Sequence, residues 1–142
     1  DKTAHTYPTI AGERYAVPGD RARFVDNHPD DFMVELFGRD SMTINSGGEK
    51  IFAEEVEAAI KAHPAVYDCV VAGRPSERWG SEAVAVVRIR SGHDVADTEL
   101  LSEAARHIAR YKLPKAIVHV NEIVRSPSGK ADYRWAKSIA QA

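Results

Sequence analysis

Two valine-rich runs in the middle of the chain place the strongest constraint on its fold. Residues 66–72 and 82–90 have the length, and the content of β-branched side chains, of buried strands. The segment between them, residues 73–80, contains glycine and proline and is predicted to be a loop. Because a sheet must bury its apolar surface against another layer, the rest of the chain has to supply helices that cover these strands.

Three further segments have the spacing of helices. Residues 52–62 carry apolar side chains at helical intervals, acidic side chains in the first turn and Pro64 after the last turn. Residues 97–110 have Asp97 as a predicted N-cap, and residues 130–140 form the last predicted helix. The apolar face of the second helix consists of Leu101, Ala104, Ala105 and Ile108.

Two shorter strands complete the predicted domain, at residues 42–45 and 115–121, and a turn at residues 46–48 follows the first of them. From residue 42 the order is strand, helix, strand, strand, helix, strand and helix. This order predicts an α+β fold in which a small mixed sheet has its helices packed on one side.

The first 40 residues have a different pattern. Residues 1–20 are polar and rich in turn formers, whereas residues 21–25 and 32–37 are predicted to pair as a hairpin. Two strands alone are only marginally stable. We therefore expect residues 1–40 to be the tail of a larger N-terminal domain that begins before Asp1, and residues 41–142 to be a small domain, with a linker at residues 38–41.

Composition excludes several classes of function. A net charge of −2 over 142 residues excludes nucleic-acid binding through bulk positive charge, and the longest apolar runs are too short to span a membrane. The single cysteine, Cys69, excludes an intrachain disulfide and indicates a reducing, cytoplasmic location. The six histidines and this cysteine lack metal-ligand spacing, so no metal site is expected within the chain.

Three stretches carry residues suited to a ligand, and each has an ordinary structural alternative. Asp20 ends a turn before a strand, where a carboxylate can accept hydrogen bonds from a ribose diol or simply cap a turn. Gly47 and Gly48 let a ligand approach the backbone, although a tight turn favours glycine too. Lys130 follows a Ser-Pro-Ser-Gly loop that lacks the P-loop pattern, and such a lysine is commonly only solvated.

Taken in order, seven short motifs resemble one family. They are Gly-Asp at 19–20, Gly-Arg-x-x-x-x-Ile at 38–44, Ser-Gly-Gly-Glu-x-Ile at 46–51, Glu-Glu-Val-Glu at 54–57, Arg-Trp-Gly at 78–80, Tyr-Lys-Leu-Pro-Lys at 111–115 and Pro-Ser-Gly-Lys at 127–130. From about residue 15 to its end, the chain is similar to the C-terminal portion of adenylate-forming enzymes, and among these to acyl-CoA synthetases, the fatty-acid–CoA ligases.

The resemblance implies a two-step ligase reaction. A carboxylic acid attacks the α-phosphate of ATP to give an acyl-adenylate, and the thiol of coenzyme A then displaces AMP. The partners it implies are the acid, ATP, coenzyme A and a large N-terminal domain that binds Mg²⁺ and the acid, while the small C-terminal domain rotates between the steps. Without that large domain, the chain alone is expected to be inactive.

Roles carried over from the family fall on individual residues. Asp20 matches the aspartate that holds the ribose, Arg39 an arginine that holds the nucleotide, and Lys130 the lysine of the adenylation centre. The hinge matches Asp40 and Ser41, where many relatives have Asp or Lys instead of serine. The coenzyme A contacts match Gly47, Gly48 and Glu49 beside the pantetheine arm, and Trp79, Tyr111 and Lys115 near the adenine and phosphates. Nearby cations that add to the predicted phosphate site are Arg106, Arg110 and Lys112.

Two other functions remain open from the sequence. One is an acyl-AMP ligase or adenylation domain that delivers the acyl group to a carrier protein, against which only the coenzyme A contacts argue. The other is a non-enzymatic α+β interaction module. The acid is expected to be a medium- or long-chain fatty acid, with a steroid side-chain acid or an aromatic acid as alternatives.

Overall fold

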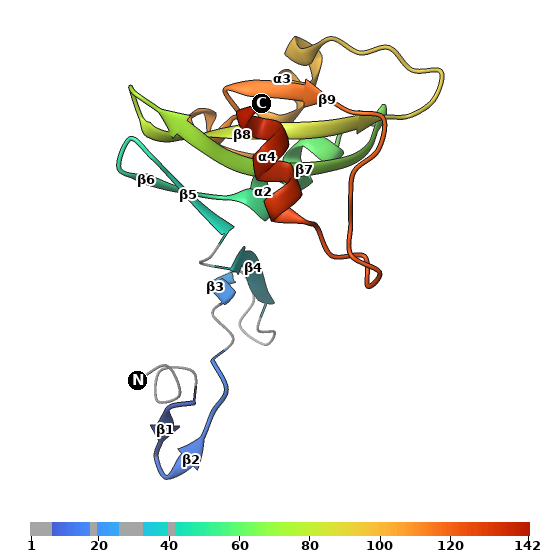
Figure 1. Ribbon diagram of the computed structural model, residues 1–142. Helices are drawn as coiled ribbons and strands as arrows, with labels where there is room; N and C mark the ends of the chain where they lie inside the picture. Colours follow the sequence, from blue (N-terminus) through green and yellow to red (C-terminus); the bar gives the residue numbers. More distant parts are fainter. Residues whose placement is uncertain (1–6, 18–19, 26–32, 40–41) are drawn as a thin grey trace. The chain divides into compact units, whose positions relative to one another are not determined.

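The computed structural model describes residues 7–17, 20–25, 33–39 and 42–142 (Figure 1). It divides into two compact units, Asp1–Ser41 and Met42–Ala142. Each unit is described by itself below.

The described residues of the first unit form two antiparallel hairpins. A short one pairs β1 (Thr9–Ile10) with β2 (Glu13–Arg14), and a longer one pairs β3 (Asp20–Val25) with β4 (Met33–Arg39). The longer hairpin was predicted, but its second strand runs on to Arg39 through residues that were predicted to be linker. The short hairpin was not expected, because its strands have only two residues each.

The second unit is built on a three-stranded sheet in the order β7-β8-β9. Antiparallel β7 (Val66–Ser76) and β8 (Gly80–Ile89) are joined by parallel pairing to β9 (Ala116–His119), so the sheet is mixed, as predicted. The prediction of a loop at residues 73–80 was wrong. Both strands continue through it until Ser76 pairs with Gly80, and only a tight turn separates them.

A hairpin of two short strands precedes the first helix of this unit. β5 (Thr43–Ser46) pairs with β6 (Glu49–Phe52), and the turn between them has Gly47 at φ 58° and Gly48 at φ 84°. Consecutive positive φ values suit a two-residue hairpin turn and explain the glycine pair. The sequence analysis missed β6, which displaces the start of α2 (Ala53–Lys61) by one residue.

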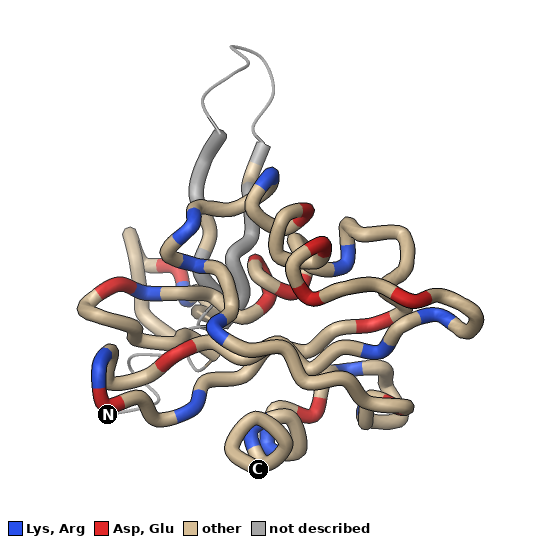
Figure 2. The backbone as a smooth tube through the Cα atoms, turned by 90° about the horizontal axis from the view of Figure 1, so that it is seen from above, with Lys and Arg blue, Asp and Glu red and all other residues tan. Residues whose placement is uncertain are grey.

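Helices cover both faces of the sheet, so the prediction that they pack on one side was wrong. Cys69 and Val71 of β7 are buried in a cluster with residues of α2 and of α3 (Asp97–Ala104). Val70 and Ala72, which alternate with them, are buried in a second cluster with α4 (Tyr133–Gln141). Figure 2 looks down α4, near the C-terminus, on its own side of the sheet. Continuous rather than alternating burial along β7 is the signature of a strand covered on both faces.

The last two helices differ from their predicted limits. α3 ends at Ala104, and residues 110–112 form a separate 3₁₀ turn, η2 (Arg110–Lys112). Asp97 is the first residue of α3 and not its N-cap, which is Ala96 without a side-chain bond. The buried residues beside α2 are Leu100, Ala104 and Ile108, whereas Ala105 is exposed. α4 starts three residues later than predicted, after Asp132 has accepted a hydrogen bond from the Trp135 amide at 3.0 Å.

Candidate functional site

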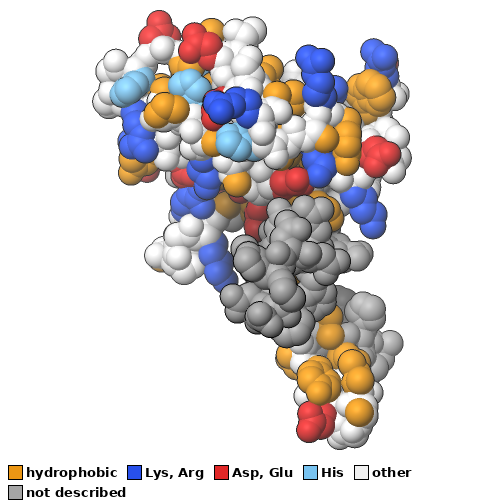
Figure 3. All heavy atoms as spheres, turned by 180° about the vertical axis from the view of Figure 1, so that it is seen from behind, with side chains coloured by type: hydrophobic (Ala, Val, Ile, Leu, Met, Phe, Trp, Pro, Cys, Tyr) orange, Lys and Arg blue, Asp and Glu red, His pale blue; other side chains and the backbone are white. Residues whose placement is uncertain are grey.

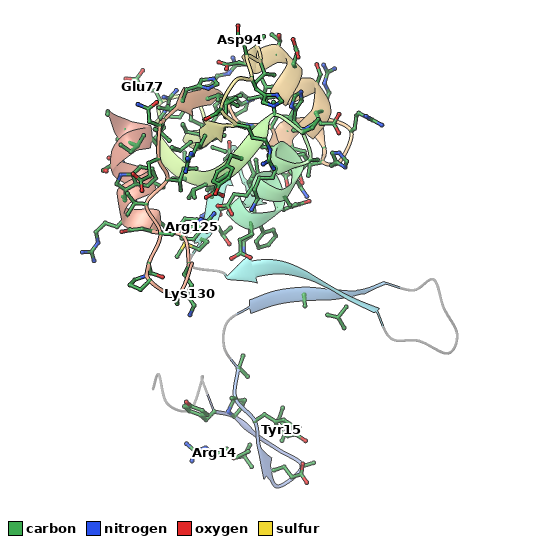
Figure 4. The ribbon with its side chains drawn as sticks, turned by 90° about the vertical axis from the view of Figure 1, so that its right-hand side faces the viewer. Arg14, Tyr15, Glu77, Asp94, Arg125 and Lys130 are labelled. Carbon is green, nitrogen blue, oxygen red and sulfur yellow. The ribbon has the colours of Figure 1, made fainter. Side chains whose placement is uncertain are left out.

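Lys130 lies on a loop that is closed by its own hydrogen bonds. Arg125 and Ala131 form a β-bridge at its base, and the Ser126 amide donates to the Lys130 carbonyl at 2.8 Å. The Ser126 hydroxyl accepts from the Lys130 amide at 3.2 Å. The Lys130 side chain is exposed at the end of this loop (Figure 4), and no group among the described residues bonds its ammonium. The loop therefore fixes the lysine backbone and leaves its charge available.

Arg125 connects this loop to the edge of the sheet. Its Nε and Nη2 donate to the two oxygens of Asp68 at 2.8 and 2.6 Å, and its Nη1 donates to the carbonyl of Gly129 at 3.1 Å. Burial favours a raised pKa for Asp68, but hydrogen bonds from Arg125 and from the Cys69 amide, with the charge of Arg125, lower the pKa below its ordinary value. Asp68 is therefore a stable anion. The sequence analysis assigned no role to either residue, which are 57 positions apart.

Trp79 is the centre of a second cluster, in the turn between β7 and β8. The Gly47 amide donates to the Trp79 carbonyl at 2.9 Å, and a Cβ on Gly47 would lie only 2.9 Å from the indole ring. The Arg78 guanidinium lies 4.7 Å and the Lys115 ammonium 5.4 Å from the ring centroid. The structure thus brings together Gly47, Trp79 and Lys115, three of the predicted coenzyme A contacts, and adds Arg78.

The other predicted residues of the coenzyme A site belong to η2 and to the β5–β6 hairpin. Tyr111 is exposed on η2, with the Lys112 ammonium 5.8 Å from its ring centroid. Lys112 also forms an ion pair with Glu55, with N–O distances of 2.9 and 3.0 Å. Gly48 and Glu49 are exposed and follow Gly47 in the β5–β6 hairpin.

Of the remaining predicted cations, Arg106 is bonded to a carboxylate of the same helix region. Its Nη1 donates to Glu103 at 3.2 Å. Hydrogen bonds from His107 and then Arg106 lower the pKa of Glu103. Arg110 is exposed at the start of η2. On the face seen in Figure 3, basic, acidic, histidine and apolar side chains of the described residues are interspersed.

In the first unit, the two predicted nucleotide-binding residues occupy opposed positions of one hairpin. Asp20 of β3 is paired with Arg39 of β4 in the strand register. The predicted hinge residues Asp40 and Ser41 lie outside the described residues.

Glu57 is a buried carboxylate that the sequence analysis quoted in a motif but did not single out. Its Oε1 accepts from the Val71 amide and from the Tyr133 hydroxyl, both at 3.0 Å, so one oxygen joins α2, β7 and α4. Burial raises the pKa of Glu57 despite these two hydrogen bonds. Its spacing of four from Ala53 and three from Ile60 places it on the buried face of α2, which is the signal that could have identified it.

The described residues contain neither a cluster of metal-binding side chains nor a membrane-spanning helix. No three His, Cys, Asp or Glu side chains in residues 7–17, 20–25, 33–39 and 42–142 gather in a group suited to a metal ion. Over the same ranges, no helix combines the length and the apolar character needed to cross a membrane.

The mixed sheet between two helical layers, with its lysine-bearing loop, defines the small α+β domain that ends adenylate-forming enzymes. Residues 55–130, more than half of the chain, match the AMP-binding enzyme C-terminal domain, and the chain belongs to this family.

Relatives with names and solved structures agree with this family. The chain is 65% identical to the medium-chain acyl-CoA ligase Mig of Mycobacterium avium, over 98% of this chain and 24% of that protein. It is 49% identical to a medium/long-chain-fatty-acid–CoA/3-oxocholest-4-en-26-oate–CoA ligase of Mycobacterium tuberculosis, over 99% of this chain and 25% of that protein. The o-succinylbenzoate CoA synthetase of Bacillus subtilis, solved with its acyl-adenylate intermediate, matches with a TM-score of 0.76 and 28% identity, over 91% of this chain and 25% of that one. The chain spans about a quarter of the length of these relatives.

Proposed function

We propose that this chain is the C-terminal part of an AMP-forming acid–CoA ligase that activates a carboxylic acid as an acyl-adenylate and transfers the acyl group to coenzyme A. The observation that carries the proposal is the cluster around Trp79. A partly buried aromatic ring, flanked by two cations from different segments, suits a nucleotide with phosphate groups. The two relatives named above are both CoA ligases, which supports the same acceptor.

In the first step, a carboxylate oxygen of the acid bonds to the α-phosphorus of ATP, and the bond from that phosphorus to pyrophosphate breaks. Negative charge grows on the α-phosphate oxygens, and the role of Lys130 is to place a fixed cation there. Its ammonium, which no described residue bonds, and its closed loop suit that task. Asp20 and Arg39 hold the ribose and the nucleotide from opposed positions of the β3–β4 hairpin.

Mg²⁺ accompanies ATP in this proposal, where it neutralises phosphate charge. The described residues of the chain offer no group suited to hold it, so we assign its ligands to the larger part of the enzyme.

In the second step, the sulfur of coenzyme A bonds to the adenylate carbonyl carbon and AMP leaves. Trp79 stacks on the adenine, and Lys115 and Arg78 turn from the ring toward the phosphates. Tyr111 extends the adenine site, whereas Gly47, Gly48 and Glu49 lie beside the pantetheine arm. Because one small domain serves both steps, we propose that it rotates about Asp40 and Ser41, which withdraws Lys130 before the thiol arrives.

The proposed acid is a medium- or long-chain fatty acid, as the names of the two mycobacterial relatives suggest, with a steroid side-chain acid as the alternative. We assign the acid pocket to the large domain and the enzyme to the cytoplasm.

The test uses the full-length ligase that contains this chain, supplied with acyl-adenylate prepared separately. We expect thioester with coenzyme A and none with an acyl carrier protein. Thioester on the carrier protein, without any on coenzyme A, would replace the proposal with an acyl-AMP ligase that serves a carrier. An enzyme that releases no pyrophosphate with any acid from a panel of fatty, steroid and aromatic acids would contradict ligase activity altogether.

A further inference from the structure

Asp68 and Arg125 form the single side-chain link, among the described residues, that joins the Lys130 loop to the sheet by hydrogen bonds. We propose that this pair, here called the Asp68–Arg125 clamp, positions Lys130 for the adenylation step. The inference rests on the role proposed for Lys130 above. Neither residue touches the reacting atoms in this proposal, so both are positioning residues.

At the sheet end, the clamp begins on a fixed carboxylate. Asp68 lies in β7 next to a register shift, and its Oδ1 accepts from the Cys69 amide at 2.8 Å while it also accepts from Arg125. The two side chains are only 17% and 29% exposed, so water screens the ion pair less than it screens a surface pair. The two parallel N–H···O bonds of a guanidinium and a carboxylate also fix their relative orientation.

At the loop end, the third donor of Arg125 reaches the carbonyl of Gly129, the residue directly before Lys130. The other hydrogen bonds of the loop are internal to residues 125–131 or lie at its base, and Ala131 packs against the cluster beneath α4. Internal bonds keep the loop in shape but do not fix it to the sheet. Figure 4 shows Arg125 and Lys130 at the same end of the domain.

This connection matters because a fixed cation stabilises a transition state only while it stays in place. A displacement of about 1 Å at a catalytic group can cost on the order of a hundredfold in rate. Loss of the clamp leaves Lys130 in its loop but lets the loop move relative to the sheet. We therefore expect a smaller loss than removal of the lysine itself, about tenfold to a hundredfold in adenylation.

The experiment measures the two half-reactions separately in the full-length ligase. Asp68→Asn removes the anion, and Arg125→Lys keeps the charge but loses the fork and the bond to Gly129. Both variants should lose about tenfold to a hundredfold in pyrophosphate release, while thioester formation from prepared acyl-adenylate and coenzyme A stays within about twofold of wild type. The matched control is Glu82→Gln, which breaks the ion pair of Glu82 with Arg74 across β7 and β8 without touching the loop. It should leave adenylation within about twofold.

A double variant separates positioning from general stability. If the clamp acts through Lys130, then adding Asp68→Asn to Lys130→Ala should cause no further loss of adenylation. The effects of substitutions in residues that act together are not additive. Additive losses, or equal losses in both half-reactions, would show a purely structural role and overturn the clamp. Suppose that Arg125→Lys and Asp68→Asn retain wild-type adenylation while Lys130→Ala loses it. That result would overturn the clamp but would leave the proposed function standing. Wild-type adenylation in Lys130→Ala would overturn the role proposed for Lys130 and, with it, the clamp, although the ligase activity itself would stand.

Discussion

The Lys130 loop and the Trp79 turn hold their central side chains in opposite ways. Trp79 is enclosed by the protein: the Gly47 backbone lies against its ring, and the cations of Arg78 and Lys115 lie 4.7 and 5.4 Å from its centroid. The ammonium of Lys130 is bonded by no described residue, whereas the backbone around it is bonded on both sides.

The difference follows from what each residue is proposed to do. A stacking platform needs the plane of its ring defined before the ligand arrives, because a ring that has to be ordered on binding reduces affinity. A cation that stabilises a transition state needs a fixed backbone and a charged group that is not already paired. An existing ion pair would compete with the reacting groups for that charge. The predictions below test this contrast, beginning with the largest effect.

Lys130→Ala in the full-length ligase should lower adenylation by about a hundredfold to a thousandfold, the usual cost of one lost transition-state contact. Pyrophosphate release measures this step. Thioester formation from prepared acyl-adenylate and coenzyme A should survive, because the lysine is withdrawn at that stage. If the second half-reaction falls as steeply as the first, Lys130 is not specific to adenylation and the contrast with Trp79 fails.

Trp79→Ala should show the reverse pattern. Loss of one base–aromatic stack costs about 1–3 kcal/mol, which corresponds to an increase of about fivefold to a hundredfold in the KM for coenzyme A. Adenylation should stay near wild type. Trp79→Phe keeps a smaller ring and should recover part of the affinity. An unchanged KM for coenzyme A in Trp79→Ala would mean that Trp79 does not contact coenzyme A.

Gly47→Ala and Gly48→Ala form a matched pair with a smaller expected difference. Both glycines have positive φ, so alanine costs roughly 1 kcal/mol of backbone strain at either position. Only at Gly47 does the new Cβ meet the Trp79 ring, at 2.9 Å, whereas at Gly48 nothing lies within 4 Å. Gly47→Ala should therefore raise the KM for coenzyme A several-fold more than Gly48→Ala.

The fluorescence of Trp79 gives this pair an independent readout, measured on the 142-residue chain in a Trp135→Phe background so that one tryptophan remains in that chain. Gly47→Ala should shift the emission of Trp79, and Gly48→Ala should leave it unchanged. Equal emission spectra for the two variants would mean that Gly47 is needed only for the positive φ of the turn and does not determine the position of the Trp79 ring.

Local patterns in the sequence were sufficient for most elements of the fold. The helical spacing of Val56 and Ile60 predicted α2 to within one residue at each end, and the valine-rich runs predicted β8 to within two residues and the start of β7, but not its end at Ser76. The predictions of these elements succeeded because periodicity is a property of short segments. The motif order assigned Trp79 and Lys115 to one coenzyme A site, which stays a prediction, although the structure does bring their side chains together.

The failures involve information that short segments do not contain. β6 has four residues and two of them are charged, so only its pairing with β5 identifies it. Coverage of the second face by α4 depends on where the chain returns to the sheet, and the Asp68–Arg125 clamp joins residues 57 positions apart. In each case, a long-range contact decides the structure, and neither propensity nor spacing predicts the partner.

Glu57 lies in the core that supports both sites, and its replacement should have the smallest effect on activity. Burial raises its pKa above the ordinary value of 4.5, so the folded chain binds more protons than the unfolded chain as pH rises from 4.5 toward the raised pKa. Stability from this group therefore falls with rising pH across that window. Gln keeps an acceptor for the Val71 amide and the Tyr133 hydroxyl but cannot ionise.

Urea unfolding of the 142-residue chain at several pH values from 4.5 upward tests this sign. The free energy of unfolding of Glu57→Gln minus that of wild type should increase as pH rises, by an amount on the order of 1 kcal/mol, the size of one hydrogen bond, so the variant gains stability relative to wild type. Glu103→Gln is the matched control, because hydrogen bonds from His107 and Arg106 lower the pKa of Glu103. From pH 4.5 upward its stability relative to wild type should stay nearly constant, because a lowered pKa moves the window in which Glu103 loses its stabilising contribution below 4.5. A Glu57→Gln difference that does not vary with pH would mean that the buried carboxylate titrates as an exposed one does.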